Sequence, residues 1–219
     1  MSYVEGDPRD QLAHVGFDVV QAGLVVGSGG NLSARFDDDL CWVTAAGSWL
    51  DRLNRGDFAL VRIADGDVAL ADGRASQPST ELALHLATYR ARPDVRAIVH
   101  LHPQSVLLLD AIGAPIRLVT TDHAYYLRRV VTAPFALPGS IELAAGAAAA
   151  AADGTNCIVL AHHGCSVLGE SVEMAHRRAR NLEEAALLTY RALSLPGAPA
   201  LRDCPEEFLD RLDRGEVSV

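Results

Sequence analysis

Two histidines separated by one residue are the feature of this sequence best suited to chemistry. His100 and His102 end a run of β-branched and apolar residues that begins near Arg96. Side chains alternate between the two faces of a strand, so both imidazoles should lie on one face and could share a metal ion. The same pair also fits two surface histidines at a strand end, so the hypothesis needs a third ligand.

His163 is the best candidate for that third ligand. It ends another apolar run and precedes Gly164, which allows a tight turn. His162 competes with it, but adjacent strand residues face opposite sides, so only one of them can point into the site. Three nitrogens leave a coordination position open, as catalytic zinc sites require. We therefore expect His100, His102 and His163 to bind a divalent metal ion, Zn²⁺ first, with Mn²⁺, Co²⁺ or Fe²⁺ as alternatives.

A glutamate at the start of a predicted helix could move protons beside this ion. Glu81 follows Ser79 and Thr80, which are candidate caps for a helix over about 81–91. Taken alone, such a glutamate more often complements the helix dipole. His85 lies one turn further along the same face. It could orient Glu81 or pack as an ordinary half-buried histidine, and packing is slightly favoured.

Two segments favour the binding of a small anion. The predicted helix start offers unpaired amides together with the Ser79 and Thr80 hydroxyls. The glycine-rich segment 27–33, which we interpret as a loop, could add donors from Gly30 and Asn31. A glycine-rich loop alone is more often only a turn, and the sequence has no Walker or dinucleotide-binding fingerprint.

The composition narrows the classes of chemistry and of partner. All 19 basic residues are arginine, which excludes a lysine Schiff base and makes a metal ion the natural electrophile for carbonyl chemistry. A net charge of −9 argues against nucleic acid and against anionic membranes as partners. Four cysteines without a CxxC pair, and an N-terminus without an apolar signal-peptide core, indicate a cytoplasmic protein.

Helices and short strands alternate along the chain, which predicts an α/β fold with a central, largely antiparallel sheet covered by helices. We assign residues 1–195 to a single domain and 196–219 to a tail with a short helix. Helices are expected at 7–22, 81–91, 140–152, 171–195 and 205–212. Strands are expected at 40–44, 58–63, 68–70, 96–102, 116–120, 130–132, 157–161 and 166–168.

An ordered set of motifs resembles the class II aldolase/adducin family over about residues 23–191. The matching segments are SGGNLS at 28–33, WVTAAG at 42–47, QPSTE at 77–81, RPDVRAIVHLHP at 92–103, APFALPGS at 133–140 and HG at 163–164. The resemblance implies an α/β fold with a central antiparallel sheet. It also implies a homotetramer with sites near the subunit interfaces.

Position by position, the resemblance also implies roles for individual residues. It makes His100, His102 and His163 the metal ligands, commonly of zinc, and Glu81 the acid/base carboxylate. The substrate phosphate would be held at Gly30, Asn31, Thr44, Gly47, Ser79 and Thr80. Where sugar-phosphate aldolases of the family tend to have a hydroxyl residue, this chain has Ala46. The missing hydrogen bond, worth about 1.5–3 kcal/mol, weakens the phosphate assignment without removing it.

The chemistry of these residues and the family resemblance both predict a metal-dependent lyase that acts on a small molecule, either a sugar phosphate or a carboxylate. We expect reversible cleavage of a ketose phosphate to dihydroxyacetone phosphate and an aldehyde through a metal-stabilised enediolate, with Glu81 moving the proton. Decarboxylation of a keto or hydroxy-aromatic acid, which Ala46 slightly favours, and epimerisation or dehydration of a sugar phosphate are alternatives. A non-catalytic adducin-type module is a further alternative, against which the intact histidines and Glu81 argue.

Overall fold

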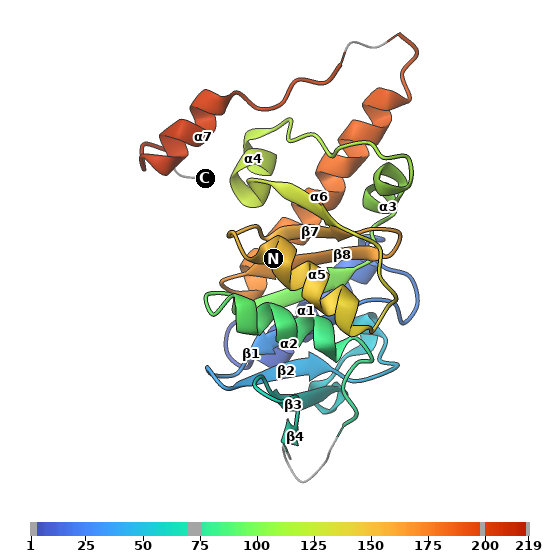
Figure 1. Cartoon of the computed structure of the whole chain (residues 1–219), viewed down its shortest axis with the longest axis vertical. Coiled ribbons are helices and arrows are strands. Elements are labelled where there is room, and N and C mark those ends of the chain that lie inside the picture. The colour runs from blue at the N-terminus through green and yellow to red at the C-terminus, as the bar shows by residue number, and fades with distance from the viewer. Residues whose placement is uncertain (1–3, 70–75, 198–199, 218–219) are drawn as a thin grey trace.

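An eight-stranded sheet runs through the middle of the computed structural model, which describes residues 4–69, 76–197 and 200–217 (Figure 1). In chain order the elements are α1 (Pro8–Gln21), β1 (Asn31–Arg35), β2 (Leu40–Thr44), η1 (Leu50–Arg52), η2 (Arg55–Asp57), β3 (Phe58–Arg62), β4 (Val68–Ala69), α2 (Leu82–Ala91), β5 (Ala97–Leu101), α3 (Gln104–Ala111), α4 (Thr121–Leu127), β6 (Val130–Ala133), α5 (Ile141–Ala151), β7 (Cys157–Leu160), β8 (Gly164–Gly169), α6 (Val172–Leu193) and α7 (Glu206–Asp213).

The strand order is β4-β3-β2-β1-β5-β8-β7-β6. Only β6 and β7 pair in parallel, and the other neighbours in this order are antiparallel. The prediction of an α/β fold with a central, largely antiparallel sheet is therefore confirmed. The expected strand at 68–70 is present as β4, although Leu70 lies outside the described residues.

Helices cover both faces of the sheet. The alternation of side chains sends Leu32 of β1 and Val99 of β5 into a core with α1 and α6. The opposite face places Ile98 in a second core with α2 and α5, which lie in front of the sheet in Figure 1. Burial of these apolar surfaces holds the strand ends, and so the histidines, in place.

The sequence misassigned the glycine-rich segment. Residues 31–35 form β1 rather than part of a loop, because they pair with β2 on one side and β5 on the other. In this register Asn31 lies opposite His100. Residues that were expected to be separate loop donors are therefore fixed beside the metal-ligand strand.

The strand expected at 116–120 is wrong. Ile116 and Leu118 instead pack from an irregular segment against the core on the α1 and α6 side. The amide of Arg117 donates to the Thr189 hydroxyl at 3.0 Å, so a side chain on α6 replaces the neighbouring strand. Alternating apolar residues fit either arrangement. The sequence analysis also missed α3 and α4.

The C-terminal part is a long helix followed by a loosely packed tail. α6 ends at Leu193, close to the predicted end, and α7 lies apart from the sheet beside α4 (Figure 1). No residue of α7 is buried. The boundary between residues 195 and 196 remains a prediction. Among the described residues, no helix combines the length and the apolar character needed to cross a membrane.

Candidate metal centre and substrate pocket

The three predicted histidine ligands lie together at the end of β5. His100 is the fourth residue of that strand, His102 follows it directly, and His163 comes from the turn between β7 and β8. One ring nitrogen of each lies within 4.8 Å of the others, and the Nε2 atoms of His100 and His102 are 3.2 Å apart. The three side chains therefore lie together, as the spacing predicted, and their role as ligands stays a prediction.

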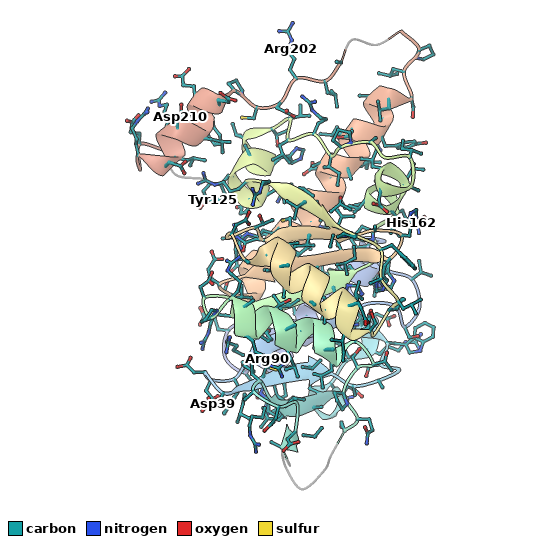
Figure 2. All side chains as sticks on the ribbon, viewed as in Figure 1. Asp39, Arg90, Tyr125, His162, Arg202 and Asp210 are labelled. Atoms are coloured by element: carbon teal, nitrogen blue, oxygen red, sulfur yellow. The ribbon has the colours of Figure 1, made fainter. Side chains whose placement is uncertain are left out.

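His162 does not belong to this group. It adopts a left-handed conformation with φ of 57° and is exposed at the edge of the molecule (Figure 2). Its amide donates to Asp110 at 2.7 Å. The left-handed turn residue is thus His162 rather than Gly164. Gly164 is needed for space, because a Cβ there would lie 2.4 Å from the Leu101 carbonyl oxygen and 2.6 Å from the His102 ring.

The arrangement of ring nitrogens fits a cation. His100 donates from Nδ1 to the Cys165 carbonyl at 2.9 Å, which leaves Nε2 as the ring nitrogen that can bind a metal ion. Nε2 lies 3.0 Å from a Glu81 oxygen. Burial, and then the neighbouring histidines, lower the pKa of His102 to about 4, and burial also lowers the pKa of His163. Ring nitrogens that face a carboxylate form a donor set that a divalent metal ion would satisfy.

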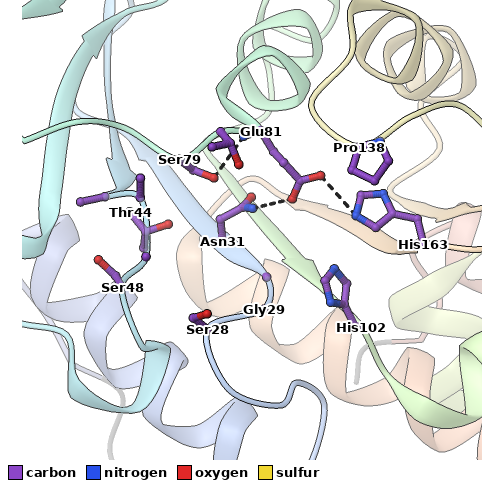
Figure 3. Close-up of a pocket in the computed structure, with 15 residues that line it drawn as sticks. Ser28, Gly29, Asn31, Thr44, Ser48, Ser79, Glu81, His102, Pro138 and His163 are labelled. Carbon is purple, nitrogen blue, oxygen red and sulfur yellow. Dashed lines mark hydrogen bonds and ion pairs between the residues drawn. The ribbon is translucent and has the colours of Figure 1, made fainter.

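Glu81 turns its carboxylate into the pocket instead of capping its helix. It is the N-cap residue of α2, but its side chain makes no capping hydrogen bond. Oε2 accepts from Asn31 Nδ2 at 2.8 Å, and Oε1 lies 3.2 Å from His163 Nε2 (Figure 3). Burial raises the pKa of Glu81, but the contacts with His100, Asn31 and His163 outweigh it and lower the pKa to about 2. Oε1 is buried without a hydrogen-bond partner, which also fits a nearby cation.

A pocket of about 430 Å³ opens in front of Glu81 and the histidines (Figure 3). All six residues expected to hold a phosphate line it: Gly30, Asn31, Thr44, Gly47, Ser79 and Thr80. The sequence analysis had not singled out Ser28, Ser48 or Pro138, which also line it. Ser28 and Ser48 border the glycine motifs, and this proximity was the available signal; Pro138 carries no chemical signal of its own.

The two segments predicted to bind an anion are joined by backbone hydrogen bonds. The Ala46 amide donates to the Gln77 carbonyl at 2.9 Å, and the Ser79 amide donates to the Thr44 carbonyl at 3.0 Å. The Thr44 hydroxyl accepts from the Leu32 amide at 3.1 Å, which ties the same loop to β1. This end of the pocket is therefore a single connected wall of glycine and hydroxyl residues.

A family model and several known proteins match most of this chain. The model of the family described as "Class II Aldolase and Adducin N-terminal domain" matches residues 10–190. L-fuculose phosphate aldolase of Methanococcus maripaludis is 32% identical over 166 residues, or 76% of this chain and 86% of that protein. The 3-oxo-tetronate 4-phosphate decarboxylase of Escherichia coli K12 is 33% identical over 192 residues, or 85% of this chain and 88% of that protein.

Solved structures agree with the sequence relatives. YgbL from Escherichia coli superposes with a TM-score of 0.82 at 29% identity, over 93% of this chain and 96% of that chain. A structure of L-fuculose 1-phosphate aldolase gives a TM-score of 0.82 at 26% identity, over 98% and 99%. The residues that the family model matches, 10–190, include the sheet, the three histidines and the pocket. This chain therefore belongs to the class II aldolase and adducin N-terminal domain family.

Proposed function

We propose that this protein is a metal-dependent lyase that cleaves a carbon–carbon bond of a small ketose phosphate, giving dihydroxyacetone phosphate and an aldehyde. The observation that carries the proposal is the convergence of His100, His102 and His163 on the carboxylate of Glu81. The aldolase named among the relatives supports this reaction. The absence of lysine from the sequence excludes the Schiff-base route to the same cleavage.

His100, His102 and His163 would hold the metal ion. When bound, a divalent ion supplies a Lewis acid for the oxygens of the substrate. Three neutral imidazoles suit Zn²⁺, and Mn²⁺, Co²⁺ and Fe²⁺ are alternatives. The carbonyl of Cys165 fixes the tautomer of His100 and thereby keeps Nε2 available as the ligand atom.

Glu81 would move the proton. Its Oε2 is held by Asn31, whereas Oε1 has no hydrogen-bond partner. In the condensation direction the ionised carboxylate takes a proton from the carbon beside the substrate carbonyl. In the cleavage direction it returns that proton to the same carbon.

The other end of the pocket would hold the phosphate through neutral donors. We assign this role to Gly30, Thr44, Gly47, Ser79 and Thr80. Asn31, which the sequence also predicted to contact the phosphate, donates its side-chain amide to Glu81. Among the described residues that line the pocket, none is an arginine. The negative charge of the phosphate would therefore be met by hydroxyl groups, backbone amides and the N-terminus of α2.

Decarboxylation of a phosphorylated keto acid is the second candidate. Ala46 lines the pocket and offers no hydroxyl to a phosphate, and one relative is named as a decarboxylase. This reaction also leaves negative charge on carbon beside a carbonyl, so the same histidines and Glu81 would serve it.

A substrate panel on zinc-loaded protein tests the proposal. L-fuculose 1-phosphate and other ketose 1-phosphates should release dihydroxyacetone phosphate, whereas 3-oxo-tetronate 4-phosphate would release carbon dioxide if the second candidate is right. Glu81→Gln keeps the size of the side chain and should lower kcat by about 10²- to 10⁴-fold. Full activity after complete removal of metal by a chelator would contradict the proposal.

Assembly belongs to the proposal as well. We propose a homotetramer, as the family resemblance implies. Light scattering on the purified protein should then give four times the chain mass of 23.3 kDa. A mass of one chain at the concentrations used for the assay would contradict this part of the proposal.

A further inference from the structure

A chain of hydrogen bonds inside the core ends on Glu81. Asn31 Nδ2 donates to Glu81 Oε2 at 2.8 Å, and Asn31 Oδ1 contacts His85 Nε2. His85 Nδ1 lies 2.6 Å from the Ser33 hydroxyl, which lies 2.8 Å from the Tyr89 hydroxyl. Asn31, Ser33, His85 and Tyr89 are each at most 4% exposed. Residues from β1 and α2 thus form one buried relay behind the pocket.

The secondary structure places these side chains in register. Asn31 and Ser33 are two residues apart on β1, so they share a face of the sheet. His85 and Tyr89 are one helical turn apart on α2. His85 therefore meets Asn31 with one ring nitrogen and Ser33 with the other. A buried histidine that only packs needs no polar partner, whereas His85 has one at each ring nitrogen.

The donors in this relay must all point toward Glu81. An ionised carboxylate only accepts, so Asn31 must turn its NH₂ group to Glu81 and its carbonyl oxygen to His85. His85 must then carry its proton on Nε2 and accept from Ser33 at Nδ1. Ser33 in turn accepts from Tyr89. Burial lowers the pKa of His85 to about 3, so its ring is neutral and has the single proton that this order requires.

We propose that His85 and Asn31 are positioning residues for Glu81, which rests on the function proposed for that carboxylate. His85 fixes the orientation of the Asn31 amide, and Asn31 fixes Oε2 of Glu81, leaving Oε1 to move the proton. The side chain of Asn31 therefore serves Glu81. The phosphate at this corner of the pocket is left to Gly30 and the hydroxyl residues.

Loss of His85 has a specific consequence in this account. Without the Nε2 donor, the Asn31 carbonyl oxygen is buried and has lost its partner from α2. The Asn31 amide can then rotate away from Glu81 to find another donor, and Oε2 of the carboxylate loses the hydrogen bond that holds it. The hydroxyl end of the pocket and the three histidines keep their own partners, so phosphate and metal binding should persist while proton transfer slows.

Three variants separate this role from a general packing role. His85→Leu should lower kcat by about 10- to 100-fold, with KM, the Kd of inorganic phosphate and the zinc content within twofold of wild type. His85→Gln should restore most of kcat, because its amide nitrogen can donate to Asn31. Thr88→Val removes a hydroxyl that is 1% exposed on the same helix but bonds Leu84, and it should leave kcat unchanged.

The role of Asn31 is tested by its own variant. Asn31→Ala should lower kcat to a similar extent and leave the Kd of inorganic phosphate within twofold. A phosphate Kd raised more than tenfold with kcat intact would overturn the proposal. Wild-type kcat in His85→Leu, or an equal loss in Thr88→Val, would also overturn it.

Nitrogen-15 NMR of histidine-labelled wild-type protein tests the relay without any substrate. The His85 signals, assigned by their loss in His85→Gln, should show a neutral ring protonated on Nε2. A ring protonated on Nδ1, or on both nitrogens at neutral pH, would overturn the proposal. If no substrate of the panel is cleaved, the proposed function fails, whereas the tautomer still decides whether the relay exists.

Discussion

The two ends of the pocket are built in different ways. At the histidine end, His100 is fully buried and bonded to the backbone of β8, and Gly164 leaves no room for a side chain beside His102. At the hydroxyl end, which comprises Thr44–Ser48 and Ser79–Thr80, glycine and small polar residues face a cavity. Ala46 and Gly47 are exposed there.

We expect the histidine end to carry out the chemistry and the hydroxyl end to select the substrate. A closely packed set of ligands tolerates little displacement, so the histidine end should be sensitive to any added atom. The hydroxyl end has neutral donors at an open surface, where side chains can change without moving the sheet. The relatives are named for different reactions, and the hydroxyl end is where we expect such differences to arise.

Gly164→Ala should break the histidine end. The added methyl group would meet the Leu101 carbonyl oxygen at 2.4 Å, and backbone cannot yield as a flexible side chain does. We expect zinc affinity to fall about 100-fold and the free energy of unfolding to fall by about 1–3 kcal/mol. Competition with a chromogenic chelator measures the zinc affinity, and thermal unfolding measures the stability. Gly146→Ala on α5, where no atom lies within 4 Å, is the matched control; equal zinc binding by both variants would contradict the comparison.

Ala46→Thr should strengthen phosphate binding at the hydroxyl end without changing the histidine end. A new hydroxyl group at the pocket wall should tighten inorganic phosphate binding about tenfold, since hydrogen bonds to charged groups are worth about 1.5–3 kcal/mol. Ala46→Val has the same shape without the hydroxyl and should leave phosphate binding unchanged. Zinc affinity should stay the same in both variants. Calorimetric titration with phosphate measures the effect, and equal affinities for Thr and Val would contradict a phosphate role for this wall.

Glu183→Gln should have the smallest effect. The Glu183 carboxylate on α6 accepts from the Ser105 amide at 3.0 Å and from the Val106 amide at 3.2 Å, and so caps α3 just beyond His102. Weakening this cap should lower the free energy of unfolding by about 1 kcal/mol and change zinc affinity little. The neighbouring Glu184→Gln should change stability less, because that side chain is 66% exposed and lies 3.7 Å from its partner His123 Nε2. A zinc loss as large as that of Gly164→Ala would show that α3 itself sets the metal site.

The sequence predicted most of the features that depend on local pattern. The period of two put His100 and His102 on one face, and the strands expected at 58–63 and 68–70 pair as β3 and β4. Membership of the family and the α/β fold with a largely antiparallel sheet are confirmed. The assigned roles of the site residues stay predictions.

Features that depend on distant partners could not be read from the sequence. Ile116 and Leu118 alternate like a strand, but the backbone of residues 117–118 bonds Thr189 on α6 and Asp203 and Cys204 in the tail, more than 70 residues away. For His85 the sequence offered only the nearby Glu81 as a polar partner, because Ser33 lies 52 residues before it. A period-two pattern in Asn31 and Ser33 was present, but the preceding glycines favoured a loop.

Metal content is the most direct test of the central claim that three histidines bind one divalent ion. Purified protein should be loaded with zinc, freed of excess metal and analysed for bound zinc by elemental mass spectrometry. The variants His100→Ala, His102→Ala and His163→Ala should be treated in the same way. We predict about one zinc ion per wild-type chain, as a three-histidine site requires, and loss of zinc in each variant. Wild-type protein that retains no zinc, or variants that retain as much as wild type, would contradict the account.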